Sequence, residues 1–316
     1  NDAINFIKNI PKAYSEPFAD SSQIPTMLVS KIASNEVKAV LTGDSGDELF
    51  GGYNRYSYTN YYWKYLKFLP PQIKRLMANA LLILPAKLVE KVIFKILSIS
   101  VSGNLEDRIS QFSNKLRVSS SEETFYRSFL GGWSMGEAFL SPDLVNNDSI
   151  PLENDFDDLN EFKFIEKMMI FDFKTYMTDD ILCKVDRGSM FSSLETRVPF
   201  LDKDVIKLSA STPIHHKING LNNKVILKKL LSKYLPENLI NRPKMGFGIP
   251  VQEWIKTDLN KWAEELLSKE LNDIHNIFDH EKVSAAWEQH KRGDMNNIMK
   301  LWPIIQFNQW YNHNNF

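Results

Sequence analysis

The sequence predicts a mostly α-helical chain attached to a fragment of a parallel α/β sheet. Residues 38–41 form a short apolar stretch that follows a helical segment and runs directly into a Gly/Asp/Ser loop. Helix, strand and polar loop in this order are the layout of one α/β unit. Beyond residue 56, apolar side chains recur at helical spacings and strand patterns almost vanish. The 316 residues suffice for one large domain or two ordinary ones.

Two helices are expected before the strand. The first carries isoleucines on one face and is expected to end at Pro11. Since the chain begins at Asn1, already inside this helical pattern, we expect it to be a piece of a longer protein. The second helix has Pro25 near its first position and an apolar stripe formed by Met27, Leu28 and Ile32. Residues 38–41 are then expected to form a buried strand.

The clearest helical pattern follows a Pro/Asn/Asp-rich loop at residues 141–158. Its apolar positions recur at steps of three and four, at Phe162, Ile165, Met169, Phe173 and Tyr176. Further helices are expected at residues 178–191, 203–211, 222–234, 252–268, 280–291 and 296–311. Pro303 is expected to kink the last of them.

Composition excludes several classes of protein. The chain has 38 Lys plus Arg against 39 Asp plus Glu, so its net charge of −1 gives no field for collecting a nucleic acid. The longest apolar run, residues 80–86, contains Pro85 and is far shorter than the roughly 20 residues that cross a bilayer. Cys183 is the single cysteine, which excludes an intrachain disulfide and a cysteine-only metal site. We therefore expect a cytoplasmic protein without nucleic-acid or membrane partners.

Residues 42–48 are the first segment that could carry chemistry. Three carboxylates, those of Asp44, Asp47 and Glu48, lie within five residues and would repel one another unless a divalent cation or a cationic partner offsets their charge. In open α/β sheets, ligands bind outside the carboxyl ends of the strands, where this loop would lie. The alternative interpretation is a solvated acidic turn, and composition alone does not decide between them.

Two further segments are rich in charge. In residues 242–250, two cations and two glycines are bracketed by prolines, so the loop could close over a polyphosphate with Lys244 at its tip. A plain helix-to-helix linker is equally compatible with this composition. In residues 179–202, Asp180 and Lys184 form an i,i+4 pair, and Glu195 and Arg197 could pair in a buried network. We favour an ion-paired scaffold that shapes a cleft for this second segment.

Five segments occur in the order and spacing of glutamine-dependent asparagine synthetases: residues 16–26, 42–53, 180–202, 242–250 and 301–310. The chain therefore resembles the C-terminal portion of the synthetase domain over nearly its whole length. The resemblance implies a parent α/β fold of the adenine-nucleotide α-hydrolase-like, PP-loop type. Within it, residues 1–56 would be the sheet-associated part and residues 57–316 the largely helical part.

The resemblance also implies a reaction. Enzymes of this family hydrolyse glutamine in an N-terminal domain and pass the ammonia through a tunnel. The synthetase domain uses ATP and Mg²⁺ to convert the side-chain carboxylate of aspartate to an adenylate, releasing pyrophosphate, and ammonia then gives asparagine and AMP. Two alternatives remain: a relative that amidates another carboxylate, such as a sugar uronate of a surface polysaccharide, and a non-catalytic helical interaction module. A homodimer is one option for the assembly.

Carried over by position, the resemblance implies catalytic roles for two residues. Asp44 occupies the acidic position associated with formation of the intermediate, and Lys244 matches the lysine that stabilises the pentavalent phosphorus and the leaving pyrophosphate. Asp47 matches the carboxylate that helps to hold Mg²⁺. Nucleotide contacts are implied for the rest of the loop, at Thr42, Gly43, Ser45 and Gly46.

Other positions resemble residues of the surrounding cleft. Glu48 is expected to order the loop or to form an ion pair, while Asp186 and Arg187 resemble residues near the substrate. A loop at the nucleotide pocket is implied for Asp20, Ser21 and Ser22.

Two hallmarks of the family are absent from these residues. The Ser-Gly-Gly-x-Asp-Ser pyrophosphate loop would lie upstream of Asn1, and Cys183 cannot replace the N-terminal cysteine of the glutaminase domain. We therefore expect that the isolated chain neither hydrolyses glutamine nor makes asparagine. Without upstream strands, residues 38–41 would also lie at an unprotected sheet edge.

Overall fold

The computed structural model describes residues 2–89, 105–130, 139–145, 159–241, 248–293 and 296–314. In these ranges the chain is mostly helical, as predicted, and the strands are β1 (Ala39–Leu41) and β2 (Glu195–Arg197). They pair in parallel, with Ala39 opposite Glu195 and Leu41 opposite Arg197. This pairing agrees with the predicted fragment of a parallel sheet, although residues 195–197 were not expected to form a strand.

The prediction that residues 38–41 are buried is wrong for this structure. The side chain of Leu41 is 75% exposed and Val40 is only half-buried. β2 supplies the backbone partner on one side of β1, while the side chains of Ala39 and Leu41 stay exposed.

Pro11 lies inside helix α1 (Asp2–Ala13), so the prediction that it ends this helix is wrong. A proline lacks the N–H that would donate to the carbonyl four residues earlier. Here the carbonyl oxygen of Ile7 accepts instead from the side-chain amide of Gln309, at 2.9 Å. The freed backbone acceptor is thus satisfied by a distant helix, and α1 continues past the proline.

Helix α2 (Gln23–Ala33) forms as predicted, but only part of its predicted stripe is buried. Met27 is fully buried, whereas Ile32 is 61% exposed. The face that packs inward consists of Gln23, Ile24, Thr26, Met27 and Ser30. The helix therefore buries several polar side chains and leaves Val29 and Ile32 exposed at the surface.

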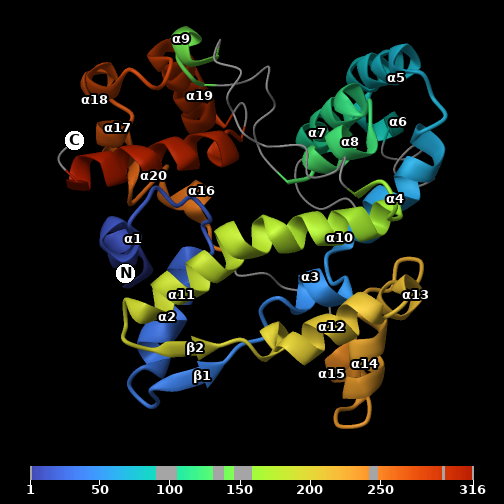
Figure 1. The fold of residues 1–316 in the computed structure, drawn as a ribbon. Coiled ribbons are helices and arrows are strands. Elements are labelled where there is room, and N and C mark those ends of the chain that lie inside the picture. Colours follow the sequence, from blue (N-terminus) through green and yellow to red (C-terminus); the bar gives the residue numbers. More distant parts are fainter. Residues whose placement is uncertain are drawn as a thin grey trace.

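A nearly continuous helical rod runs through the centre of the molecule (Figure 1). It consists of α10 (Phe164–Lys174), the π-helix η4 (Tyr176–Leu182) and α11 (Cys183–Met190). Phe162 precedes α10 and is 46% exposed, so it does not belong to the predicted apolar stripe. The sequence predicted helices here but not the π-helical turn. Such turns are rare in proteins, and those that occur often lie at functional sites.

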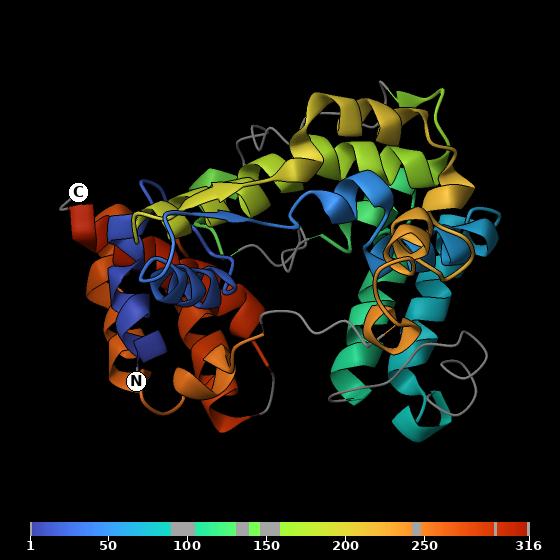
Figure 2. The same cartoon turned by 90° about the horizontal axis from the view of Figure 1, so that it is seen from below.

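The helices form two groups, one toward each end of this rod (Figure 2). One group shares a core with α1 and α2, and comprises α16 (Val251–Trp254), α17 (Asn260–Leu266), α18 (Lys269–His275), α19 (His280–Arg292) and α20 (Ile298–Asn314). The other shares a core with α10, and comprises α4 (Asn54–Leu66), α5 (Pro71–Ile83), α6 (Ala86–Val89), α7 (Leu105–Val118) and α8 (Glu122–Arg127). The predicted helix at 252–268 is thus divided into α16 and α17.

Shorter elements complete the described chain. They are α3 (Gly46–Phe50), α9 (Pro142–Val145), the 3₁₀ turn η5 (Pro199–Leu201), α12 (Lys203–Ser211), α13 (Ile214–Lys217), α14 (Val225–Leu231) and α15 (Glu237–Ile240). Helix α12 has the predicted bounds, whereas α14 is shorter than the predicted 222–234.

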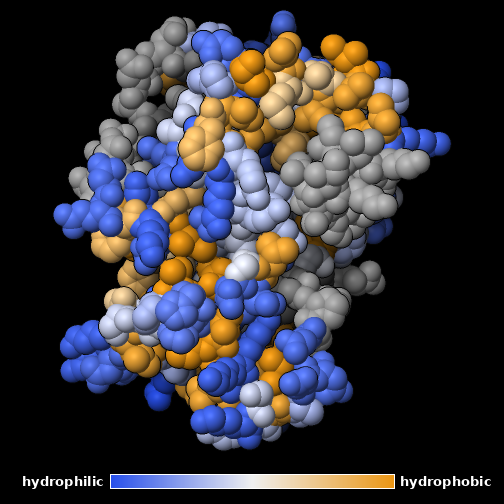
Figure 3. Space-filling view, turned by 90° about the vertical axis from the view of Figure 1, so that its right-hand side faces the viewer, coloured by the Kyte–Doolittle hydropathy of each residue, from blue (hydrophilic) through white to orange (hydrophobic). Residues whose placement is uncertain are grey.

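Apolar side chains gather at the surface of α4 and α5, toward the top of Figure 3. Phe68 is 77% exposed and Ile83 is 83% exposed. Beside them lies an apolar hollow of about 320 Å³, lined by residues of α4, α5 and α7 that include Tyr65, Met77 and Phe112. None of the described helices has both the length and the apolar character needed to cross a membrane.

Candidate functional site

The acidic loop follows β1 and leads directly into the short helix α3. Ser45 caps α3 in a left-handed conformation, with φ of 65°, and Gly51 ends the helix in the same region, with φ of 67°. A Cβ atom on Gly51 would also lie 2.5 Å from the Ile218 side chain. Both ends of the turn are therefore fixed by backbone conformations that few residue types adopt readily.

The three carboxylates of this loop point to different surroundings. Oδ1 of Asp47 lies 2.8 Å from Nζ of Lys224. Glu48 is 2% exposed and its Oε1 accepts a hydrogen bond of 2.6 Å from the Tyr53 hydroxyl. Asp44 is half-buried at the start of the turn. The expected repulsion is thus relieved by separation and by a cationic partner, one of the two remedies predicted from the sequence.

Glu48 is tied to the central rod through Tyr53. Burial is the main reason why the pKa of Glu48 is raised above its usual value, and the Tyr53 hydrogen bond acts against this shift. The Tyr53 ring lies 4.1 Å from the guanidinium of Arg55, which pairs with the fully buried Asp172 of α10 at 2.5 Å. Asp172 also accepts from the Tyr56 hydroxyl at 2.6 Å. This network fixes the loop against α10.

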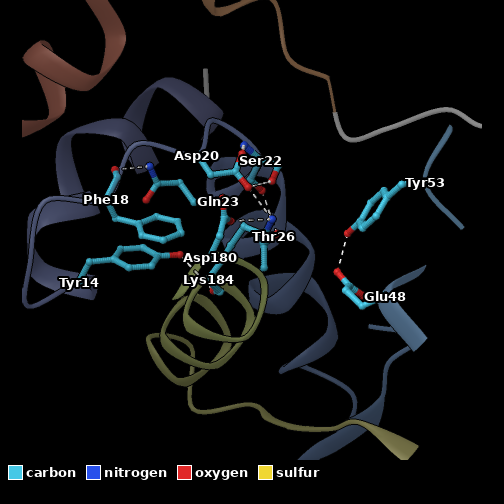
Figure 4. A network of polar contacts seen from close by, with 10 residues as sticks. All are labelled: Tyr14, Phe18, Asp20, Ser22, Gln23, Thr26, Glu48, Tyr53, Asp180 and Lys184. Carbon is cyan, nitrogen blue, oxygen red and sulfur yellow. Dashed lines mark hydrogen bonds and ion pairs between the residues drawn. The ribbon is translucent and has the colours of Figure 1, made fainter. Parts of the chain in front are cut away.

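A second cluster joins the loop before α2 to the π-helix (Figure 4). Nζ of Lys184 lies 2.5 Å from Oδ2 of Asp20 and 3.6 Å from Oδ1 of Asp180. Asp20 also accepts from the backbone N–H and the hydroxyl of Ser22, at 2.9 Å and 2.6 Å. The predicted i,i+4 pair of Asp180 and Lys184 is therefore present, and both of its residues contact the predicted nucleotide-pocket loop.

The two carboxyl groups of this cluster share one lysine, and their pKa values move apart. Burial first, and then the charge of Asp20, raises the pKa of Asp180 from 3.8 to about 7. Burial would also raise the pKa of Asp20, but the Lys184 charge and the hydrogen bonds from Lys184 and Ser22 hold it below its usual value. The cluster can therefore take up or release one proton near neutral pH at Asp180.

Tyr176 lies between the two clusters. Its ring packs edge-on against Tyr53 with centroids 5.8 Å apart, and the Arg55 guanidinium lies 4.7 Å from it. Burial is the main cause that raises the pKa of Tyr176, and the negative charges of Asp180, Asp20 and Glu48 add to the shift. Carboxylates of both clusters thus act on the same ring, so the two clusters belong to one region of the molecule.

The other predicted residues lie in varied surroundings. Thr42 is half-buried and its N–H donates to the Arg197 carbonyl at 2.9 Å. A Cβ on Gly46 would lie 3.0 Å from the Phe200 ring, whereas nothing lies within 4 Å of one on Gly43. Ser21 is half-buried beside Ser22.

Some predicted positions lie apart from both clusters. Asp186 is exposed, and Arg187 forms a surface ion pair of 2.8 Å with Glu16. The pair of Glu195 and Arg197 forms at 2.8 Å, but both side chains are more than half exposed, so its predicted burial is wrong. Lys244 lies outside the described residues, as does the rest of 242–247.

Sequence reasoning missed several residues of this region: Lys224, Tyr53, Arg55, Asp172 and Tyr176. Tyr53 follows the Gly51-Gly52 pair directly after the loop, and that proximity was an available signal. Lys224 carried no such signal, because it lies far downstream and reaches Asp47 only through the fold.

Three buried polar atoms of the loop find no hydrogen-bond partner among the described residues. They are the hydroxyl oxygens of Thr42 and Ser45 and Oε2 of Glu48. Buried polar groups are normally satisfied, so an unpartnered set within one turn fits a polar ligand. No group of three or more His, Cys, Asp or Glu side chains in the described ranges could hold a metal ion alone. Mg²⁺ often needs only one or two carboxylates together with substrate phosphates, and this loop contains the carboxylate of Asp47, the predicted metal ligand.

Comparisons with known proteins agree on one family. A family model described as asparagine synthase matches residues 1–312. Asparagine synthetase [glutamine-hydrolyzing] 1 of Bacillus subtilis is 28% identical over 312 residues, which cover 98% of this chain and 46% of that protein. An asparagine synthetase domain-containing protein of Saccharomyces cerevisiae is 38% identical over 98 residues, covering 30% of this chain and 18% of that protein. No solved structure matches. The chain thus spans about half the length of the Bacillus subtilis protein, 46%.

Proposed function

The chain belongs to the asparagine synthase family, and from this premise we propose that it forms part of an ATP-dependent amidotransferase. The enzyme adenylates the side-chain carboxylate of aspartate and transfers glutamine-derived ammonia to it, giving asparagine, AMP and pyrophosphate. The observation that carries the proposal is the turn after β1. There residues 42–48, at the carboxyl end of a parallel strand, carry Asp44, Asp47 and three buried polar atoms without a partner among the described residues.

The loop residues would hold the nucleotide. The hydroxyl groups of Thr42 and Ser45 can donate to phosphate or ribose oxygens, and Gly43 and Gly46 would let the backbone lie close to the nucleotide. Asp47 would hold Mg²⁺, and Mg²⁺ when bound neutralises phosphate charge. Lys244 is proposed to stabilise the pentavalent phosphorus and the leaving pyrophosphate.

The first reaction step joins two anions. A carboxylate oxygen of the acceptor forms a bond to the α-phosphorus while the bond to pyrophosphate breaks. Asp44, half-buried at the start of the turn, is proposed to assist formation of this adenylate. The polyphosphate and the acceptor both carry negative charge, so cationic groups around the loop lower the energy of their approach.

The second step releases a proton. Ammonia attacks the acyl carbon, the bond to AMP breaks, and the nitrogen loses one proton as the amide forms. Asp180 has a pKa near 7 and lies in the cluster that shares Tyr176 with the loop. We propose that Asp180 accepts this proton, because a base is most effective when its pKa is close to the working pH.

The remaining partners are inferred from the family. The glutaminase domain would be another part of the same protein, and we propose that these 316 residues alone are inactive. The alternatives are amidation of a different carboxylate, such as a sugar uronate, and a non-catalytic interaction role.

The test measures aspartate-dependent release of pyrophosphate and AMP by the complete protein, with MgATP and ammonia. We expect turnover with aspartate, none with a uronate sugar, and strong loss in Asp47→Asn. Turnover with the uronate alone would establish the other acceptor. If the complete protein turns over neither acceptor and shows no Mg²⁺-dependent nucleotide binding, the non-catalytic interaction role is correct. Turnover by the isolated 316 residues would contradict the proposed inactivity.

A further inference from the structure

Lys224 and Asp47 form an ion pair between segments that are far apart in the chain. Their Nζ and Oδ1 atoms are 2.8 Å apart, and the side chains are 32% and 24% exposed. The two side chains are thus partly exposed, but Oδ1 of Asp47 itself is buried, so a ligand can reach this oxygen only when the lysine moves aside.

The backbone of Lys224 is held in an unfavourable conformation. Its φ of 54° and ψ of 37° place it in the left-handed region, at the residue that caps α14. Such a conformation is disfavoured for a side chain with a Cβ, so surrounding contacts must impose it.

The neighbouring Asn223 provides those contacts. It is 8% exposed, and its side-chain oxygen accepts from the Ser57 hydroxyl at 2.5 Å. Its side-chain amide donates to Asn54 at 3.0 Å and to the Gly52 carbonyl at 3.4 Å. Asn223 thus fastens the segment before α14 to the segment after the acidic loop. This fixes the backbone position of Lys224, the next residue.

Gly52 provides the space for the pair. A Cβ atom on Gly52 would collide with Oδ1 of Asp47 and with Cε of Lys224. The lysine side chain therefore passes directly over the glycine to reach the carboxylate. The Gly52 N–H also donates to the Asp47 carbonyl at 2.8 Å, so all three residues are held together.

The same loop holds buried polar atoms that point to a ligand. Ser45 is 1% exposed and Glu48 is 2% exposed, and each has a side-chain oxygen with no hydrogen-bond partner among the described residues. These atoms are independent of the Lys224 pair. They indicate that a polar ligand binds within reach of Asp47.

We propose that Lys224 is a positioning residue that holds Asp47 and competes with the divalent cation for its Oδ1 atom. A cation on this oxygen would displace the ammonium group. On its flexible four-carbon stem, the displaced group would then reach a phosphate oxygen of pyrophosphate. This inference rests on the proposed function, because it assigns the polyphosphate to the loop.

The competition predicts opposite effects on two ligands. Removing the lysine charge in Lys224→Met should tighten binding of Mn²⁺ alone by about fivefold, since a partly exposed ion pair contributes about 1 kcal/mol. The same change should weaken binding of magnesium pyrophosphate by about tenfold, since a charge-assisted contact to phosphate is lost. Electron paramagnetic resonance measures free Mn²⁺, and calorimetry measures pyrophosphate binding, in the complete protein.

Three further variants sharpen the test. Lys229→Met removes an exposed charge from α14, the helix that Lys224 caps, and should change neither affinity. Lys224→Arg should retain pyrophosphate binding, and Lys224→Gln replaces the methionine variant if thermal melting shows that the latter is unfolded. Unchanged or weaker Mn²⁺ binding without the Lys224 charge would overturn the proposed competition for Asp47. Unchanged pyrophosphate binding would overturn the proposed contact between the Lys224 ammonium group and phosphate. Neither measurement needs turnover, so a failure of the proposed reaction is recognised separately by absent AMP formation in the wild type.

Discussion

The side-chain amide of Gln309 in α20 donates to the backbone carbonyl of Ile7 in α1, at 2.9 Å and fully within the core. This is the carbonyl that Pro11 leaves without a helical donor. The contact therefore joins the first and the last helix of the described chain at the point where the first helix lacks a bond.

Gln309→Met should lower the free energy of unfolding by about 1–3 kcal/mol, because it leaves a buried acceptor unsatisfied. Urea denaturation of the single variant measures this loss. In a Pro11→Ala background the alanine N–H can donate to Ile7, so the same change should cost less. Equal losses in both backgrounds would show that the carbonyl does not depend on Gln309.

Asp180 makes stability depend on pH. Its pKa is about 7 in the folded protein against 3.8 as its ordinary value, so the folded state binds more protons between these values. The contribution of Asp180 to the free energy of unfolding is therefore favourable at low pH and falls as pH rises from about 4 to 7. Asp180→Asn removes this fall and should stabilise the protein at pH 8 by about 1–2 kcal/mol, a value reduced for partial solvent screening.

Thermal melting across this pH range tests the Asp180 prediction. At pH 4 the variant and the wild type should melt alike. Asp179→Asn removes a neighbouring, exposed carboxylate and controls for the change in net charge. A constant difference between Asp180→Asn and the wild type at all pH values would contradict the assignment.

Arg55 neutralises a carboxylate that water does not reach. Asp172 is fully buried and pairs with Arg55 at 2.5 Å. Arg55→Met should therefore destabilise the protein by about 3–5 kcal/mol, because it strands a buried charge. Arg117→Met removes an exposed arginine that bonds Asn79, and its effect should be near zero. Chemical denaturation compares the two, and similar small losses would show that Asp172 is satisfied without Arg55.

Gly51 and Gly43 should respond differently to the same substitution. Gly51→Ala places a Cβ in a left-handed conformation and 2.5 Å from Ile218, so we expect a loss of about 2–4 kcal/mol in stability. Gly43→Ala meets nothing within 4 Å and should leave the stability nearly unchanged. Urea midpoints distinguish these cases, and an unaffected Gly51→Ala protein would show that the turn can adopt another backbone conformation.

The sequence predicted the helices more successfully than the strands. Helix α12 and helix α19 follow periodic apolar patterns that extend over several turns, so nearest neighbours in the chain suffice to reveal them. Strand β2 has only three residues and is defined by backbone bonds to β1, which no local pattern encodes. The exposure of Leu41 likewise depends on what covers the strand and not on its own composition.

The candidate site was predicted in part. Asp44, Asp47 and Glu48 were identified as one loop because they are adjacent in the chain, but their separate orientations were not foreseen. The catalytic role implied for Lys244 stays a prediction, because residues 242–247 lie outside the described ranges.

Short sequence patterns were enough to determine the family, most helices and the turn that carries the carboxylates, because these features involve residues close in sequence. Tertiary structure alone decided that Lys224 neutralises Asp47, that Lys184 is shared by Asp20 and Asp180, and that Gln309 compensates for Pro11. Charges and hydrogen-bond partners are chosen by distance in space, and the packing of helices against one another sets those distances.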